Sequence, residues 1–366
     1  MTTTTSPKMK AIVQEGYGAP ERVLQLEEVD RPSIGADDVL IRVRATSVNT
    51  PDWIAVAGIP YLLRLKSGLR RPSNPVRGSD VAGIVESVGK NVTDLQPGDE
   101  VFGSLWDDTV NTQAGTFAEL TVASASQLIK KPVKLTFEEA AASVMSGLTA
   151  LIAMRDVGRV GPRIRVLING ASGGVGTFAV QIAKALGAEV TGVCSTKNLQ
   201  LVRSLGADHV IDYTKDDFTR SPQRYDVILD NVMNHPPSAT ARVLTANGIL
   251  IPNSIGNTGR FLAGLPRMTR AAIMGRGSTE VQFVKCVVNR ENLDALATLL
   301  ESGDVRVVID KIYAFSETAT AVAHMLRHHA RGKVVVAVRR GNGSTTSSDN
   351  DEQSGAKQLE TIKETL

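Results

Sequence analysis

The pattern of apolar and polar positions divides the chain into three consecutive regions. In the first, short apolar runs lie between Gly and Pro turns, which is typical of β-strands. Strands are expected at Lys10–Val13, Val23–Glu28, Val39–Arg44, Ala82–Val88, Glu100–Phe102 and Phe117–Val122. This region is therefore predicted to be β-rich.

In the second region, apolar runs alternate with amphipathic stretches. A capping box of Thr136 and Glu139 predicts a helix that continues to Ala153. The strands expected after it are Arg165–Asn169, Glu189–Cys194, His209–Asp212, Asp226–Asn231, Ile249–Pro252 and Val281–Val288. Helices are expected between them at Val175–Leu186, Thr196–Leu205 and Ser238–Thr245. Strict alternation of this kind predicts a parallel, doubly wound α/β sheet.

The third region has only four elements, expected at Glu291–Ser302, Val305–Ile312, Glu317–His329 and Val334–Val338. These are too few to form a domain alone, so we expect them to rejoin the first region. The last 26 residues, 341–366, are polar and rich in Gly and Ser at their start, which predicts a disordered tail.

Composition narrows the class of protein. The chain has 366 residues, 42% of them hydrophobic and 22% charged, as in soluble two-domain proteins. No apolar run has the length of a membrane span and the start lacks a signal core, so a cytoplasmic protein is expected. A net charge of +3, without a dense basic stripe or stacking aromatics, argues against nucleic-acid binding. Cys194 and Cys286 are predicted to be reduced, buried thiols.

The most informative motif follows the strand at Arg165–Asn169. Ala171, Gly173 and Gly176 occupy the three positions of a G-x-G-x-x-G fingerprint whose first glycine is alanine. Such a turn between strand and helix lets the backbone approach a pyrophosphate, and the N–H groups that open the helix bind the anion. The predicted dinucleotide contacts are Ala171, Ser172, Gly173, Gly174, Val175 and Gly176.

The end of the next strand indicates which dinucleotide fits. An acid about twenty residues after the last glycine would bind an unphosphorylated ribose, but the chain has Ser195, Thr196 and Lys197 there. Two hydroxyls, an ammonium and the nearby Tyr213 favour a 2′-phosphate, so NADPH is the expected cofactor. The alternative is that Ser195 only caps a helix and Lys197 is solvated.

With these residues in hand, the chain resembles the medium-chain dehydrogenase/reductase superfamily, in its zinc-independent quinone-oxidoreductase-like branch. The resemblance rests on Asp80–Gly89, Pro97–Gly103, Gly170–Gly176, Leu205–Tyr213 and Ala330–Val336. It implies a GroES-like β-barrel catalytic domain plus a Rossmann doubly wound parallel sheet. The expected division is a disordered start (1–8), catalytic domain (9–135), Rossmann NADPH-binding domain (136–288), a return segment completing the catalytic domain (289–340) and the tail (341–366).

Zinc is where the sequence departs from the alcohol-dehydrogenase members. By the resemblance, the catalytic Cys position is Asn49 and the His–Glu pair is Ser79–Asp80, while zinc needs Cys, His or acidic ligands. The four cysteines of a structural zinc lobe are also missing. His324 and His328 have i, i+4 spacing, but a solvated helix face is the expected explanation. No metal is therefore predicted.

Without a metal, the substrate must delocalise the incoming charge itself. The predicted reaction is hydride transfer from NADPH to a quinone or an α,β-unsaturated carbonyl. The resemblance places Asn49 near the nicotinamide and Thr149 against its ribose or the pyrophosphate. Further expected contacts at the crevice are Asn231, Ser254 and Ile255; Lys333 either reaches the cofactor or only ends a strand. Tyr61 is a candidate proton donor, with packing in a substrate loop as the alternative.

Several functions stay open at this point. The enzymatic alternatives are an enoyl-thioester reductase and an NAD(P)-dependent alcohol-dehydrogenase-like enzyme. The non-enzymatic alternative is an NADPH-binding sensor or structural subunit. A homodimer is expected through the apolar strand Val281–Val288, paired edge to edge with its copy.

Overall fold

The computed structural model describes residues 7–61, 64–106, 115–254, 265–275, 279–327 and 330–338. Most of the predicted disordered start and the whole predicted tail, 341–366, lie outside the described residues. Ile255 and His328 do as well. Lys8, expected to be disordered, is instead the first residue of a strand.

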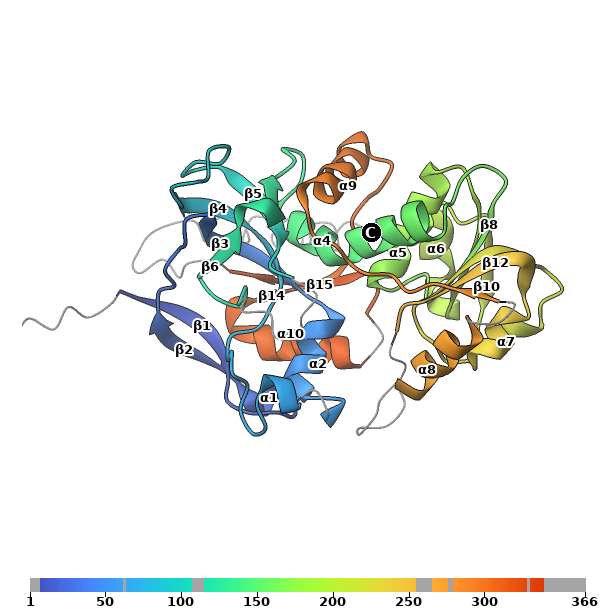
Figure 1. Cartoon of the computed structure of the whole chain (residues 1–366), viewed down its shortest axis with the longest axis horizontal. Helices are drawn as coiled ribbons and strands as arrows, with labels where there is room; N and C mark the ends of the chain where they lie inside the picture. Colours follow the sequence, from blue (N-terminus) through green and yellow to red (C-terminus); the bar gives the residue numbers. More distant parts are fainter. Residues whose placement is uncertain are drawn as a thin grey trace, which may run out of the picture.

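An antiparallel sheet holds most of the first region (Figure 1). The strands run in the order β14-β15-β3-β4-β5-β7, with β6 also paired to β3. A separate hairpin of β1 and β2 joins it through a bridge between Ala11 and Ala118. The bounds are β1 Lys8–Gln14, β2 Leu24–Asp30, β3 Asp38–Val48, β4 Asp80–Val88, β5 Glu100–Ser104, β6 Leu120–Ser124, β7 Leu128–Lys130, β14 Ile309–Ala314 and β15 Lys333–Ala337.

The chain's late strands enter this same sheet. β15 pairs antiparallel with β3, so that Val334 faces Val48, and β14 pairs parallel with β15. This pairing brings Lys333, at the start of β15, beside the end of β3. Residues 285 positions apart in the chain are thereby placed next to each other.

The second sheet is parallel throughout, in the order β10-β9-β8-β11-β12-β13. Its first strand in the sequence, β8, lies in the middle, and the chain proceeds outward on both sides of it. Ligands bind at such a reversal, outside the carboxyl ends of the strands. The bounds are β8 Arg165–Asn169, β9 Glu189–Cys194, β10 His209–Asp212, β11 Tyr225–Asp230, β12 Leu244–Pro252 and β13 Glu280–Val281. The predicted α/β fold class is confirmed.

The helices cover and connect the sheets. Their bounds are α1 Pro20–Val23, α2 Thr50–Ala57, α3 Arg64–Ser67, α4 Phe137–Ile152, α5 Gly174–Ala185, α6 Leu199–Ser204, α7 Pro237–Ala241, α8 Leu265–Met274, α9 Arg290–Ser302 and α10 Thr318–Leu326. The predicted capping box opens α4: the Thr136 amide donates to the Glu139 carboxylate at 2.9 Å, and the Glu139 amide to Thr136 Oγ1 at 3.1 Å.

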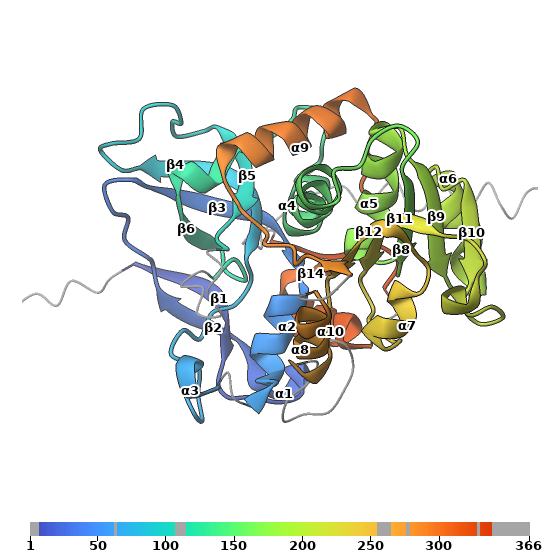
Figure 2. The ribbon, with the colours of Figure 1, turned by 45° about the vertical axis from the view of Figure 1, so that its right-hand side comes forward.

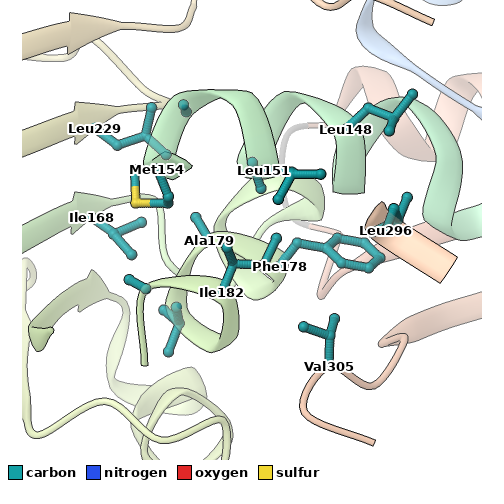
Figure 3. Close-up of a cluster of buried hydrophobic side chains, with 14 of the residues drawn as sticks. Leu148, Leu151, Met154, Ile168, Phe178, Ala179, Ile182, Leu229, Leu296 and Val305 are labelled. Atoms are coloured by element: carbon teal, nitrogen blue, oxygen red, sulfur yellow. The ribbon is translucent and has the colours of Figure 1, made fainter. Parts of the chain in front are cut away.

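Helix α4 lies between the two sheets, packed against β3, β4 and α5 (Figure 2). Its apolar side chains, such as Leu148 and Leu151, meet Phe178 and Ile182 of α5 and Leu296 of α9 (Figure 3). Among the described residues, the stretch Phe137–Val157 is apolar and long enough to cross a membrane, yet 83% of that window is buried inside the protein. Its composition therefore matches its place in the core.

The expected strand Val281–Val288 is wrong over most of its length. Only Glu280 and Val281 form strand pairs with β12; the Gln282 amide still donates to the Leu250 carbonyl at 3.0 Å, and residues 282–288 are not part of a strand. The physical reason lies in β12, which ends at Pro252, a residue without an N–H to donate. Phe283 and Val287 remain 41% and 38% exposed on this segment.

Three further expectations need correction. The helix expected at Ser238–Thr245 ends at Ala241, because the Val243 carbonyl accepts the Tyr225 amide at 2.8 Å and commits the chain to the sheet. The strand expected from Val305 starts only at Ile309. The helix expected from Thr196 begins as a 3-10 turn, with α6 starting at Leu199.

Candidate active site

The glycine turn joins β8 to α5. Gly170 has φ +77°, in the left-handed region that favours glycine, and its amide and that of Ala171 donate to the Val193 carbonyl of β9 at 3.1 and 3.0 Å. A Cβ added to Gly176 would lie 2.1 Å from the Gly170 oxygen and 2.8 Å from the Ala171 Cα. Glycine is therefore required at Gly176 by backbone contact, which holds the helix close to the strand.

The start of α5 is suited to a pyrophosphate. Gly173 is the N-cap of this 12-residue helix, so the amides of Gly174, Val175 and Gly176 form its first turn and have no acceptor within the helix. A Cβ on Gly174 would approach Ser146 Oγ at 3.1 Å and Lys333 Cδ at 3.2 Å. The residues of the turn fit a dinucleotide diphosphate, and Ser146 and Lys333 border the same place.

The end of β9 carries the residues expected at a 2′-phosphate. Thr196, Lys197 and Tyr213 are exposed and Ser195 is half-buried. The Thr196 hydroxyl donates to the Asp212 carboxylate at 2.5 Å, an interaction that lowers the pKa of Asp212. Thr196 therefore has no hydroxyl hydrogen left for a phosphate, which corrects the expectation of two hydroxyl donors. Asp212, on the neighbouring strand β10, is an acid that the motif search overlooked.

Asn198 connects the glycine turn to this region. Its Nδ2 donates to Ser172 Oγ at 2.9 Å and to Ser195 Oγ at 3.3 Å. Because Ser195 accepts this bond, its own O–H hydrogen can be donated to a ligand. Asn198 is buried, and its Oδ1 has no hydrogen-bond partner among the described residues. Sequence reasoning missed Asn198 because a lone Asn after a strand has no distinctive pattern.

A second buried polar atom without a hydrogen-bond partner among the described residues lies just after β11. Asn231 accepts from Asn253 Nδ2 at 2.7 Å through Oδ1, while its own buried Nδ2 has no partner among the described residues. A buried donor without an acceptor costs about 1–3 kcal/mol unless a ligand supplies one. Asn231 and Ser254 follow β11 and β12, at the edge where a nucleotide binds in this fold.

A buried polar cluster lies where β3, α2, β4 and β15 meet. Asn49 Nδ2 donates to Asp80 Oδ2 at 2.8 Å, and Ser47 Oγ donates to the same oxygen at 2.8 Å. Lys333 Nζ donates to Asn49 Oδ1 and to the Val48 carbonyl, the latter at 3.4 Å. Both ends of the Asn49 amide are thus held. We refer to Asn49, Asp52, Asp80 and Lys333 as the buried cluster.

Asp52 is the fourth member of the buried cluster. Its carboxylate accepts the Asn49 amide at 2.7 Å at the start of α2. Burial raises the pKa of Asp52 to about 7 against this hydrogen bond, with the negative charge of Asp80 adding to the rise. Burial also raises the pKa of Asp80 and lowers the pKa of Lys333. Arg77 is buried nearby. Its guanidinium donates to Gln14 Oε1 at 2.7 Å and interacts with the charge of Asp52.

Two other predicted site residues are placed differently. Thr149, on α4, donates its hydroxyl to the Met145 carbonyl at 2.7 Å, so only its oxygen lone pairs remain for a ligand. Asn49 precedes the first residue of α2, and Tyr61 follows its last turn. The helix between them is about 12 Å long. The Tyr61 ring stacks with the Arg64 guanidinium, 4.4 Å from the ring centroid. Tyr61 therefore does not belong to the buried cluster.

The positions expected to replace zinc ligands do come together. Asn49 lies 3.5 Å from Ser79 Oγ as well as 2.8 Å from Asp80. Across the described ranges, no group of three His, Cys, Asp or Glu side chains is arranged to hold a metal. A solvated face was expected for His324, and this expectation is wrong. Its ring bonds Tyr313 at 3.1 Å and Asp310 at 3.1 Å, both on β14.

The chain matches two family models, "Alcohol dehydrogenase GroES-like domain" over residues 35–133 and "Zinc-binding dehydrogenase" over residues 205–336. The first covers β3 to β7 of the antiparallel sheet. The second covers β10 to β13 of the parallel sheet and continues through β14 into β15. The chain therefore belongs to the medium-chain dehydrogenase/reductase superfamily, and it is a nicotinamide-dependent oxidoreductase.

Within that superfamily it is quinone-oxidoreductase-like. A chloroplastic quinone-oxidoreductase of Triphysaria versicolor is 32% identical, over 90% of this chain and 98% of that protein. A trans-enoyl reductase of Aspergillus terreus is 34% identical over 84% and 88%. The quinone oxidoreductase structure from Coxiella burnetii superposes with a TM-score of 0.79 at 29% identity, covering 91% of this chain and all of that one.

Proposed function

We propose that this protein is a zinc-independent, NADPH-dependent reductase of quinones or α,β-unsaturated carbonyls. The observation that carries the proposal is the buried cluster beside the glycine turn. Amide, hydroxyl and ammonium groups occupy the place where zinc enzymes of the superfamily need thiolate and imidazole. The names of the quinone and enoyl reductases above support the same substrate chemistry.

The chain's residues would hold the cofactor and the substrate in a fixed geometry. The first-turn amides of α5 bind the diphosphate, and the unfilled Asn231 Nδ2 donates to the nicotinamide half. Asn49, held at both ends of its amide, lines the reacting end. The bound NADPH supplies the hydride, and a conjugated acceptor spreads the resulting charge, so positioning and electrostatics provide most of the catalysis.

NADPH rather than NADH is supported by Ser195, Lys197 and Tyr213 and by the lack of an acid at the end of β9. Asp212 argues in the other direction, since its carboxylate takes the Thr196 hydroxyl. Three donors of charge-assisted hydrogen bonds remain, Ser195, Lys197 and Tyr213, at about 1.5–3 kcal/mol each. The balance favours the phosphorylated cofactor.

The experiment that tests the proposal measures NADPH oxidation with quinones, enones and enoyl thioesters as acceptors. A metal chelator is present in every assay. Turnover of quinones or enones that survives chelation is expected. Wild-type enzyme that oxidises NADPH with none of the three classes contradicts the proposal. If Tyr61 is the proton donor, Tyr61→Phe lowers enoyl reduction about 10²-fold and spares quinones; we expect no such loss, given the place of Tyr61 beyond α2.

We also propose a homodimer formed by the segment 282–288, which extends the edge of the parallel sheet. The segment follows β13, the last strand of this sheet, and Phe283 and Val287 are exposed along it. Exposed apolar side chains at the edge of a sheet favour pairing with a second copy. Val287→Asp should shift sedimentation from dimer to monomer, while Leu26→Asp, at an exposed leucine on β2, should not. A monomeric wild type contradicts the proposal.

A further inference from the structure

The Lys333 ammonium is held in a place that its structural role does not explain. It is fully buried on β15, and its stem lies against Gly174, the first residue of the cofactor-binding helix α5. Gly332, immediately before it, pairs with Gly173, and the Gly332 amide donates to the Ser172 carbonyl at 2.9 Å. The Lys333 side chain therefore runs along the contact between the glycine turn and the antiparallel sheet.

The hydrogen bonds of Lys333 are incomplete. An ammonium has three hydrogens, and here two are accepted by neutral oxygens, Asn49 Oδ1 and the Val48 carbonyl. No carboxylate lies within ion-pair distance of Lys333 among the described residues, although Asp80 and Asp52 are close enough to favour its charged form. One N–H thus remains for an oxygen atom that a ligand brings.

The rest of the buried cluster keeps this N–H in place. Asn49 cannot rotate away without losing its bond to Asp80 at 2.8 Å, so its oxygen stays directed at Lys333. The carboxylate charge of Asp80 is already spread over Ser47 and Asn49, both neutral donors. A buried cation bonded only to neutral groups is suited to an oxyanion, because the new charge is not screened by water.

We propose that Lys333 is a catalytic residue, the electrophile and proton donor that binds the carbonyl oxygen of the substrate. This inference rests on the proposed function. A hydride from a bound nicotinamide would form a bond to the β-carbon of an enone, or to one carbonyl oxygen of a quinone, and the displaced π electrons would leave an electron pair on the remaining carbonyl oxygen. The remaining Lys333 N–H bond then breaks, its proton forms the new O–H bond, and Lys333 is left as an amine that solvent re-protonates. The product is a hydroquinone, or an enol that tautomerises in water.

The chemistry of the site supports this assignment over Tyr61. The Lys333 ammonium is next to Asn49, whereas Tyr61 lies beyond the opposite end of α2. Burial lowers the pKa of Lys333, which makes its ammonium a stronger acid than an exposed lysine. The charges that face it are Asp80 on β4 and Asp52 on α2, and Asp52 is in turn close to the positive charge of Arg77.

The test uses 4-nitrophenol as a probe of an oxyanion site, with the enzyme saturated by NADP⁺. The probe is yellow only as the phenolate, so absorbance reports which form is bound without any turnover. Wild-type enzyme should bind the phenolate preferentially. The bound probe should therefore ionise at a lower pH than the free probe does. Lys333→Met keeps the stem against Gly174 and removes the charge, and phenolate affinity should fall about tenfold. Lys333→Arg should recover part of it.

The matched control is Lys311→Met, which removes an exposed ammonium from the adjacent strand β14 and should leave the titration unchanged. In single-turnover assays, quinone reduction by Lys333→Met should be about 10²-fold slower, with NADP⁺ affinity within threefold of wild type. Equal phenolate affinity in wild type and Lys333→Met overturns the proposal, as does absence of phenolate binding by wild type.

Loss of NADP⁺ affinity alone would make Lys333 a cofactor ligand and would also overturn the proposal. Thermal unfolding identifies a misfolded Lys333→Met, in which case Lys333→Arg and Lys333→Gln decide by the same titration. Failure of the proposed function is a different result, since wild-type enzyme would then oxidise no NADPH with any acceptor.

Discussion

The two ends of the site are built in opposite ways. At the adenosine end, Ser195, Thr196 and Lys197 are consecutive, follow one strand and lie near solvent. At the reacting end, Asp52, Asp80 and Lys333 come from three elements, Asn49 joins β3 to α2, and all four are buried. Exposed polar groups act almost independently and are screened by water and salt, whereas buried ones depend on each other's hydrogen bonds. The first end can be altered one residue at a time, and the second cannot.

The glycine turn joins the two ends, and its disruption should have the largest effect. Gly176→Ala places a Cβ 2.1 Å from the Gly170 oxygen, so strand and helix must separate and the α5 amides must move. NADPH affinity should fall about 10²-fold or more, the loss of one or two charge-assisted hydrogen bonds. Calorimetry measures this, with thermal unfolding to confirm that the variant folds.

Gly161→Ala is the matched control, because nothing lies within 4 Å of the position that its Cβ would take. Its NADPH affinity should equal that of the wild type. An affinity of Gly176→Ala within threefold of wild type would show that the turn does not position the diphosphate.

The second prediction concerns the buried cluster through Asp52. Its pKa is about 7 in the folded protein and near 3.8 when exposed, so folding takes up a proton between these values. The stability from this group is present below pH 4 and is lost as pH rises through 7. Between pH 5 and 8 the wild type should lose on the order of 2 kcal/mol that Asp52→Asn does not lose.

Urea unfolding at the two pH values measures this difference. Asp216→Asn, which removes an exposed carboxylate after β10, serves as the control and should follow the wild type. If Asp52→Asn shows the same pH dependence as the wild type, Asp52 is already ionised in the folded protein at pH 5, and burial does not raise its pKa as described.

The contrast between the two ends also explains what the sequence predicts. The alternation of strands and helices that predicts a parallel sheet, the glycine turn and the Thr136–Glu139 capping box follow from residues close together in the chain. The buried cluster joins positions 49, 80 and 333, which become neighbours through the pairing of β3 with β4 and of β15 with β3. Asn49 was a candidate by resemblance; its link to Lys333 has no sequence signal.

Predictions from local sequence patterns were wrong where contacts with a distant part of the chain determine the structure. The apolar run Val281–Val288 has strand composition, yet only its first residue, Val281, lies in a strand, because β12 ends at Pro252. His324 has the spacing of a metal pair on a helix, yet it bonds Asp310 and Tyr313 of β14. In both cases the neighbouring strand decides, and the sequence of the segment itself does not name that neighbour.

The smallest effect is expected at the adenosine end. Lys197→Ala should weaken NADPH binding about tenfold and leave NADH binding unchanged, because only the 2′-phosphate meets the ammonium. Asp212→Asn should act in the opposite sense and strengthen NADPH binding severalfold, since it removes a carboxylate next to the same pocket. Fluorescence titration with both dinucleotides measures each change. Lys197 is exposed, so its effect should shrink as salt rises, whereas the loss caused by Lys333→Met should not. A salt-independent loss at Lys197, or tighter NADH than NADPH binding by the wild type, would show that the two ends do not differ in this way.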